Sequence, residues 1–233
     1  MIDPPGEARA PRMPDPPSGA RAPRMRDAPD PSELPVPDRP TPSPLSRCWW
    51  PAGVEPADVL MAAYHDEEWG VPAHGDAVLF ERLALESFQA GLSWSTILHK
   101  RPAFRRAFAE FDPAVVAAFD ASDVRRLVGD AGIVRNRAKI AATIGNARGV
   151  LEIAREAGSF DAWLWGQLDG PPRSLPPGST RGDVPSADPL AHRLSRDLRD
   201  RGFRFVGPTI VYAFMQSIGM VDDHLPGCWR YGG

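Results

Sequence analysis

One carboxylate, Glu86, falls where a charge is unfavourable. Helical spacing places it on the same face as Leu79 and Leu83, whereas Glu81 and Arg82 are expected on the polar face of that helix. Burying an unpaired carboxylate costs on the order of several kcal/mol. Glu86 is therefore expected to be paired with a core arginine, to be neutral or to serve a function.

The residues that follow this helix have the composition of a tight turn. In the run Gln-Ala-Gly-Leu-Ser-Trp over 89–94, Gly91 permits the turn, Leu92 forms an apolar tip and Trp94 provides an aromatic surface. A protein that enters a base stack and holds an extruded base needs these features. An ordinary core turn would have the same composition.

Both cysteines of the chain have a histidine partner at a distance seen in metal sites. Cys48 precedes His65 by 17 residues, and His224 precedes Cys228 by four. Tetrahedral zinc accepts two cysteines and two histidines, and the second pair is tightly spaced. A disulfide is the alternative, although without an export signal the thiols are expected to stay reduced. The spacing alone leaves both possibilities open.

The segment 122–139 reads as a helix, a tight turn and a second helix. Gly129 and Gly132 flank the turn, and Arg135 and Arg137 follow it. In such a hairpin, main-chain N–H groups at the start of the second helix meet a phosphate, and arginines add attraction that is independent of sequence. A plain helical hairpin with solvated arginines is the alternative.

The composition limits the classes of protein that this chain can belong to. The chain has 233 residues and a net charge of −3, so any positive surface for nucleic acid must be local. No apolar run of membrane-spanning length and no export signal is visible, which predicts a cytoplasmic protein that contacts no membrane. Its only two lysines are Lys100 and Lys139, so an amine nucleophile is not expected.

Residues 1–46 and 47–233 differ sharply in composition. The first segment holds 14 of the 27 prolines and few aromatic or β-branched residues, which predicts a disordered extension. From Arg47 onward the apolar spacing is helical and no sustained alternation predicts a sheet, so 47–233 is expected to form one all-α domain.

The capping residues predict where the helices lie. We expect helices over 76–90, from Pro102 onward, after Asp112, over 122–128, over 136–157, from Ser159 onward, over 186–201 and over 208–218, with a surface loop over 170–187. The helix over 208–218 is apolar around most of its circumference and should lie in the middle of the domain.

Five segments together resemble the bacterial 3-methyladenine DNA glycosylase I family. They are AYHDEEWGVP (63–72), FQAGLSW (88–94), DAGIVRNRAKI (130–140), RGFRFVGPT (201–209) and DHLPGC (223–228), and they occur in the family's order. The resemblance implies a helix-hairpin-helix DNA glycosylase fold. It also implies one structural zinc ion, bound by Cys48, His65, His224 and Cys228, that joins the two ends of the domain.

The resemblance also assigns roles to the residues of the pocket. It places recognition of the base, and with it catalysis, on Glu86, with Tyr64 and Trp94 as aromatic neighbours. The chain departs from the family pattern at Met61, where a tyrosine is expected in one wall of the pocket. The stretch 144–147 offers no aspartate of the kind that most helix-hairpin-helix glycosylases use.

These observations predict a base-excision repair enzyme that acts as a monomer on double-stranded DNA. It would hydrolyse the N-glycosidic bond of flipped 3-methyladenine without cutting the strand, while Leu92, Gly132, Arg135 and Arg137 contact the DNA. Two alternatives remain: a noncatalytic helix-hairpin-helix DNA-binding module, and a glycosylase that prefers another alkylated base. A module of the first kind would need the hairpin arginines but not Glu86.

Overall fold

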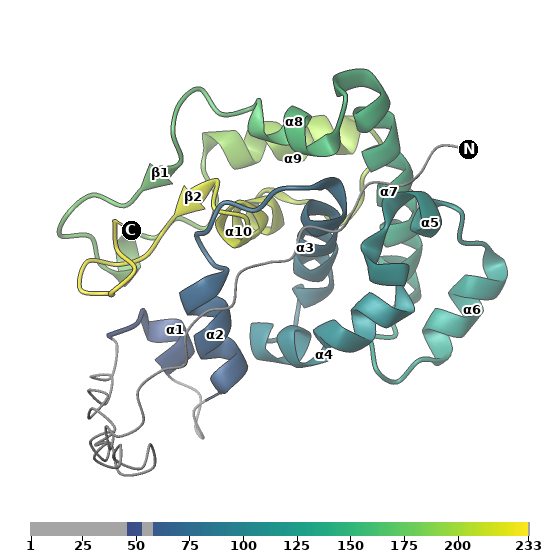
Figure 1. The fold of residues 1–233 in the computed structure, drawn as a ribbon, viewed down its shortest axis with the longest axis horizontal. Helices are drawn as coiled ribbons and strands as arrows, with labels where there is room; N and C mark the ends of the chain where they lie inside the picture. Colours follow the sequence, from purple (N-terminus) through teal and green to yellow (C-terminus); the bar gives the residue numbers. More distant parts are fainter. Residues whose placement is uncertain (1–45, 53–57, 233) are drawn as a thin grey trace, which may run out of the picture. The chain divides into compact units, whose positions relative to one another are not determined.

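Helices form nearly all of the regular structure (Figure 1). The computed structural model describes residues 46–52 and 58–232, so the predicted extension over 1–46 lies outside the described residues except for Ser46. Within those ranges, no helix combines the length and the apolar character needed to cross a membrane.

The prediction of a mostly helical chain is confirmed. The α-helices are α1 (Trp49–Ala52), α2 (Val59–Glu67), α3 (Asp76–Gln89), α4 (Trp94–Ala107), α5 (Pro113–Ala117), α6 (Ala121–Gly129), α7 (Arg137–Ala157), α8 (Phe160–Trp165), α9 (Pro189–Asp200) and α10 (Pro208–Ser217). Two 3-10 helices, η1 (Ala109–Phe111) and η2 (Arg181–Asp183), complete the helical set. The strands β1 (Arg173–Ser174) and β2 (Val221–Asp222) form a short parallel pair.

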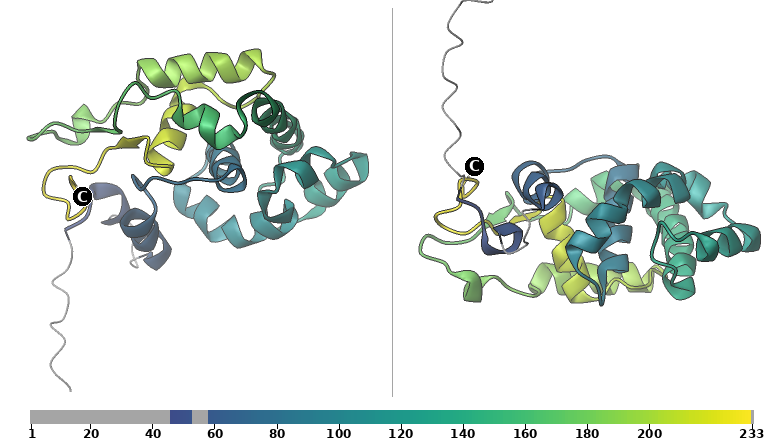
Figure 2. Two further views of the ribbon diagram at one scale, coloured as in Figure 1. Left: turned by 45° about the horizontal axis from the view of Figure 1, so that its top comes forward. Right: turned by 90° about the horizontal axis from the view of Figure 1, so that it is seen from below.

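Helix α3 lies in the centre of the fold, between α10 and α7 (Figures 1 and 2). On one side α10 packs against α3 and α9, and on the other α7 packs against α3, α5 and α8. Fully buried phenylalanines fill the space between α3, α4 and η1: Phe80, Phe88, Phe104, Phe108 and Phe111. Helix α10 packs between α3 and α9, and most of its apolar side chains are buried, as its apolar pattern predicts. The core holds the pocket-bearing end of α3 in place.

Three predicted capping residues have their expected role. Asn136 caps α7, Ser159 caps α8 and Asp112 caps α5, each accepting hydrogen bonds from main-chain N–H groups of the first turn. Three predicted starts are wrong. Asp188, not Ser186, caps α9, with Oδ1 accepting a hydrogen bond from Ala191 N at 2.7 Å. Asp120, not Ser122, caps α6, and it forms a reciprocal capping box with the third residue of that helix.

Helix α4 also begins earlier than Pro102 predicts. Ser93 caps it, with Oγ accepting a hydrogen bond from Thr96 N at 3.2 Å, and Pro102 lies inside the helix. A proline is tolerated in the first turn of a helix, but its ring does not mark the start when a better cap lies upstream. Helix α4 therefore begins at Trp94, directly behind the turn at Gly91.

Candidate functional site

A cavity of about 500 Å³ opens beside the C-terminal end of α3. Its volume is that of a site for a small organic molecule. Helices α1, α2, α3, α4 and α10 contribute to its wall, and the segment between η2 and α9 closes one side with Val184 and Pro185. The other lining residues are Trp49, Trp50, Met61, Tyr64, Trp69, Glu86, Gln89, Ser93, Trp94, Ser95, Ala213 and Gln216.

Glu86 is a buried carboxylate in the wall of this cavity. Its side chain is 4% exposed, and among the described residues it has no hydrogen bond or ion pair. Burial raises the pKa of Glu86 to about 8, while the nearby Arg82 lowers it only in part. The alternative of a salt bridge to a core arginine is not realised among the described residues: Arg82 pairs with Glu68 through Nη2, and its buried Nε and Nη1 contact no acceptor. Glu86 is left with acceptor capacity facing the cavity.

The predictions for Glu81 and Arg82 are wrong, because both side chains are buried. Glu81 accepts hydrogen bonds from Arg105 Nε at 3.0 Å and also pairs with Arg101. Arg101 reaches Glu68 at 2.8 Å, so this ion-pair network joins α3 to α2 and α4. Glu68, Glu81, Arg101 and Arg105 are therefore paired with one another, whereas Arg82 pairs only through Nη2 and Glu86 has no partner among the described residues.

Aromatic side chains surround the space in front of Glu86. The ring of Tyr64 lies 5.0 Å from that of Trp94, and the rings of Trp50 and Trp69 are 5.2 Å apart. Met61 occupies the wall where the resemblance leads one to expect a tyrosine. Aromatic faces and a carboxylate together suit a flat, cationic ligand.

The turn between α3 and α4, whose flanking residues Gln89 and Ser93 line the cavity, exposes an apolar side chain. Gly91 has a φ of +87°, a conformation that glycine adopts without strain, and Leu92 is 41% exposed. Lys139 of α7 holds this turn from below: its Nζ donates to Phe88 O at 2.9 Å and to Ala90 O at 2.8 Å. The turn is thereby attached to the second helix of the hairpin.

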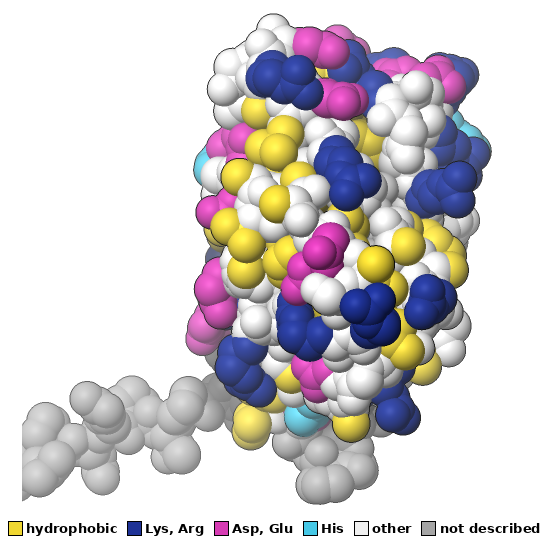
Figure 3. Space-filling view, turned by 90° about the vertical axis from the view of Figure 1, so that its right-hand side faces the viewer, with side chains coloured by type: hydrophobic (Ala, Val, Ile, Leu, Met, Phe, Trp, Pro, Cys, Tyr) yellow, Lys and Arg dark blue, Asp and Glu magenta, His cyan; other side chains and the backbone are white. Residues whose placement is uncertain are grey.

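The predicted hairpin is formed by α6, the turn 130–136 and α7. Arg135 and Arg137 are exposed and line a second hollow together with Val128 and Val134. The N–H of Gly132 is used inside the turn, where it donates to Asp130 Oδ1 at 2.7 Å. Figure 3, which views the end with α5 and α6, shows lysine and arginine side chains scattered among hydrophobic ones.

The turn between α6 and α7 is held by the other lysine, Lys100. Lys100 Nζ donates to Ala131 O at 3.1 Å and to Gly132 O at 3.3 Å. A side chain on Gly132 would approach Ala103 Cβ to 3.0 Å, so the close packing of α4 against the turn requires glycine there. Both lysines of the chain therefore bind main-chain carbonyls near the hairpin.

Asn146 lies in the stretch 144–147, which has no aspartate, and its side chain has a structural role. Its side chain is buried and makes two hydrogen bonds to the main chain of Arg204, one from Nδ2 to the carbonyl and one from the N–H to Oδ1. These contacts fix the segment before α10.

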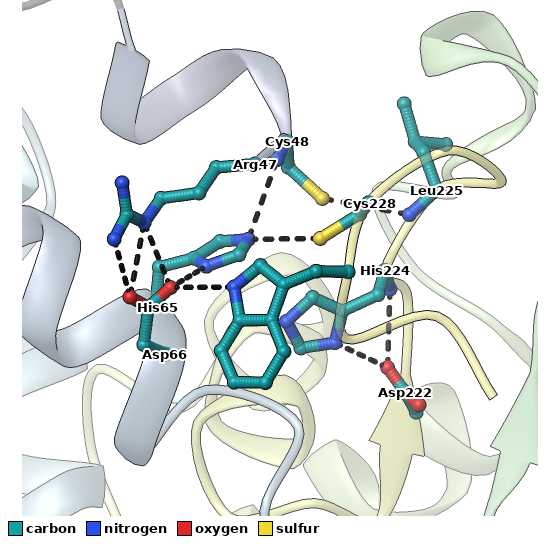
Figure 4. A network of polar contacts seen from close by, with 9 residues as sticks. Arg47, Cys48, His65, Asp66, Asp222, His224, Leu225 and Cys228 are labelled. Atoms are coloured by element: carbon teal, nitrogen blue, oxygen red, sulfur yellow. Dashed lines mark hydrogen bonds and ion pairs between the residues drawn. The ribbon is translucent and has the colours of Figure 1, made fainter. Parts of the chain in front are cut away.

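Three of the predicted metal ligands converge (Figure 4) beside the aromatic wall of the cavity, where the ring of His65 lies 5.3 Å from that of Trp50. The ligand atoms of Cys48, His65 and Cys228 lie within 4.8 Å of one another, and all three residues are buried. Both cysteines are free, so the alternative of a disulfide is not realised. The cluster joins the segment before α1 to the segment after β2.

The fourth predicted ligand, His224, lies next to this cluster. Its ring centroid is 4.8 Å from that of His65, and its Nε2 is buried with no hydrogen-bond partner among the described residues. Each histidine uses Nδ1 to contact a carboxylate, Asp66 Oδ1 at 2.8 Å for His65 and Asp222 Oδ1 at 2.6 Å for His224. Such contacts orient the Nε2 of a metal-binding histidine.

Fold and site together define a class: a helical protein in which an aromatic pocket with one unpaired carboxylate lies beside a helical hairpin. A profile of the methyladenine glycosylase family matches residues 54–231. DNA-3-methyladenine glycosylase 1 of Escherichia coli K12 is 45% identical over 81% of this chain and 98% of its own length. DNA-3-methyladenine glycosylase of Haemophilus influenzae is 41% identical over 78% of this chain and 96% of its own.

Solved structures agree with these relatives. A crystal structure of 3-methyladenine DNA glycosylase I superposes with a TM-score of 0.75 at 44% identity, over 80% of this chain and 100% of its own. The Staphylococcus aureus enzyme superposes with a TM-score of 0.74 at 38% identity, over 79% of this chain and 96% of its own. The chain belongs to the methyladenine glycosylase family.

Several lining residues of the pocket were not predicted from the sequence. Trp50, Trp69, Gln89 and Gln216 come from separate parts of the chain. Trp69 and Gln89 lie in segments that resemble the family, but nothing in their spacing assigns them to the pocket.

Proposed function

We propose that this protein is a DNA repair glycosylase that hydrolyses the N-glycosidic bond of 3-methyladenine in alkylated DNA. The observation that carries the proposal is Glu86, a buried carboxylate that lies in an aromatic pocket and has no partner in the part of the chain that the structure describes. The family relatives named above, which are methyladenine glycosylases, support the same activity. The glycosylase domain would correspond to residues 47–233.

The chemistry of the lesion explains what the pocket has to supply. Methylation at N3 leaves adenine cationic, so the glycosidic bond is weakened and the base is a good leaving group. Selective binding of the flipped base is then the main requirement: Glu86 accepts hydrogen bonds from its donors, and Tyr64 and Trp94 pack on its faces. Water attacks the sugar carbon as positive charge develops there, and the released base departs.

The DNA-binding end would be formed by the two turns. Leu92 enters the base stack of double-stranded DNA, while Arg135 and Arg137 contact the backbone at the hairpin and Gly132 keeps its turn tight. This assigns the pair α6 and α7 as a helix-hairpin-helix element. We propose a monomer as the active form.

The enzyme would remove the base without cutting the strand. A lyase needs an amine nucleophile, and both lysines of the chain are engaged with main-chain carbonyls. Burial also lowers the pKa of Lys139, but its ammonium lies between two carbonyls rather than in the pocket.

The residues at the Cys-His cluster fit one structural zinc ion. Cys48, His65 and Cys228 converge, and the buried Nε2 of His224 lacks a partner, which a fourth metal bond would supply. Bound zinc would hold the two ends of the domain together. With four protein ligands it would leave no position for water, and no step of the reaction involves it.

Release of free 3-methyladenine from alkylated duplex DNA tests the proposal. Wild-type protein should release it, and Glu86→Gln should lower the rate by about tenfold or more, since a charged hydrogen bond contributes roughly 1.5–3 kcal/mol. Glu152→Gln is the matched control, because Glu152 is an exposed carboxylate on α7. Binding of DNA without release of any base would instead identify a noncatalytic module. Release of another alkylated base in preference to 3-methyladenine would identify a glycosylase with a different base preference.

A further inference from the structure

An exposed aromatic residue, Phe205, occupies an unusual backbone conformation. Its φ is +56°, in the left-handed region that favours glycine, and 40% of its surface is exposed. Its neighbour Arg204 is exposed as well. Two features of Phe205 are therefore unfavourable: its backbone has a strained φ, and its hydrophobic side chain is exposed to solvent.

Buried polar side chains hold this segment in place from both neighbouring helices. Asn146 of α7 makes two hydrogen bonds to the main chain of Arg204, at 3.0 and 2.9 Å. Ser87 of α3 donates to Phe205 O at 3.0 Å. Strain that is fixed by several independent contacts points to a function at the strained residue.

The flanking residues anchor the segment further. Phe203 is buried with its ring against Gly149, where a Cβ would approach the ring to 2.3 Å. Val206 is buried, and its carbonyl accepts a hydrogen bond from Ser195 Oγ at 2.7 Å. The chain therefore enters and leaves the core on either side of Arg204 and Phe205, and presents only these two side chains outward.

The position of this pair relates it to the DNA-binding end. Ser87 directly follows Glu86 in α3, and Leu92 comes only five residues after Ser87. Asn146 lies on α7, nine residues after Arg137, which corresponds to about 14 Å along a helix. The exposed pair thus projects between the helix that bears the pocket and the helix that follows the hairpin.

We propose that Arg204 and Phe205 form a second DNA-contacting element. Phe205 packs into the minor groove near the point where Leu92 enters, and Arg204 contacts a phosphate of the same duplex. Phenylalanine is one of the side chains that proteins insert from the minor groove, and a rigid main chain lets it do so without first becoming ordered. The proposal rests on the proposed glycosylase function.

Phe205→Asn tests the aromatic contact. Asparagine tolerates a positive φ, so the variant should keep its melting temperature near that of the wild type. Affinity for a duplex with an abasic-site analogue, measured by fluorescence anisotropy, should fall by roughly tenfold or more. Binding of free 3-methyladenine, measured by quenching of tryptophan fluorescence, should be unchanged. Val78→Asn is the control, because Val78 is similarly exposed at the opposite end of α3.

Arg204→Ala tests the phosphate contact, and it should reduce the dependence of log Kd on log salt concentration by about one. Wild-type duplex affinity in both variants would overturn the inference, as would a loss of affinity that only follows a lowered melting temperature. The proposed function would be unaffected if the wild type still releases 3-methyladenine. A wild type that binds duplex DNA but releases no base would remove the proposed function instead.

Discussion

The burial of the titratable Glu86 should make the stability of the protein depend on pH, and Glu86→Gln should remove the part of that dependence that Glu86 causes. Burial raises the pKa of Glu86 to about 8 in the folded protein, against an ordinary value of 4.5. Between these pH values the folded state retains a proton that the unfolded state has released. Raising the pH therefore favours unfolding, and the stability that is present below pH 4.5 is lost as the pH passes 8.

The size of the effect follows from the difference between the two pKa values. One pKa unit corresponds to about 1.4 kcal/mol, so ionisation of Glu86 lowers the free energy of unfolding by about 5 kcal/mol by roughly pH 9. Glutamine has a similar size and no charge. Relative to the wild type, Glu86→Gln should therefore gain about 4 kcal/mol between roughly pH 5 and pH 9, because part of the effect already lies below pH 5. In a domain of this size that equals a difference in melting temperature of about 8–16 °C.

Urea unfolding at both pH values, followed by far-UV circular dichroism, measures this difference. Other titrating groups affect both proteins alike and cancel when the two are compared. Glu152→Gln should show no pH-dependent difference from the wild type, because the carboxylate of Glu152 is already in solvent. If Glu86→Gln differs from the wild type by the same amount at both pH values, Glu86 is not held neutral by burial and the reasoning fails.

Four further results are expected. Excision by the wild type should rise as the pH approaches 8, because ionised Glu86 binds a cationic base better; initial rates that stay flat with pH would contradict this. Metal analysis should find about one zinc ion per chain, and Cys228→Ser should lose both the ion and thermal stability. Borohydride should trap no covalent adduct with DNA, and an adduct at Lys139 would identify a lyase. Lys139→Met should lower the excision rate more than the affinity for undamaged duplex, because the turn before α4 loses two hydrogen bonds.

The sequence predicts helices well where a cap and an apolar stripe agree. Asn136 and the stripe of α7 locate that helix correctly, and the apolar circumference of α10 agrees with its packing between α3 and α9. Prediction fails where two caps compete. Ser93 begins α4 and leaves Pro102 in its interior, and Asp120 replaces Ser122 because its carboxylate completes a capping box.

The same limit applies to the site. The burial of Glu86 could be predicted because it follows from helical spacing, which is local information. The burial of Glu81 and Arg82 could not be predicted from spacing, since it depends on the partners Arg101 and Glu68, which are remote in sequence. The position of Gln216 in the wall of the cavity likewise depends on how α10 packs against α3.

The hydrogen bonds of Lys100 and Lys139 bear on the unusual ratio of arginine to lysine in this chain. Arginine supplies 25 of its 27 lysine and arginine residues. The two lysines that remain each place an ammonium between a pair of main-chain carbonyls. A compact ammonium donates in several directions from one atom, whereas a planar guanidinium needs a wider site. The two lysines of the chain thus lie where one ammonium serves a pair of main-chain carbonyls, one at the turn between α3 and α4 and the other at the turn between α6 and α7.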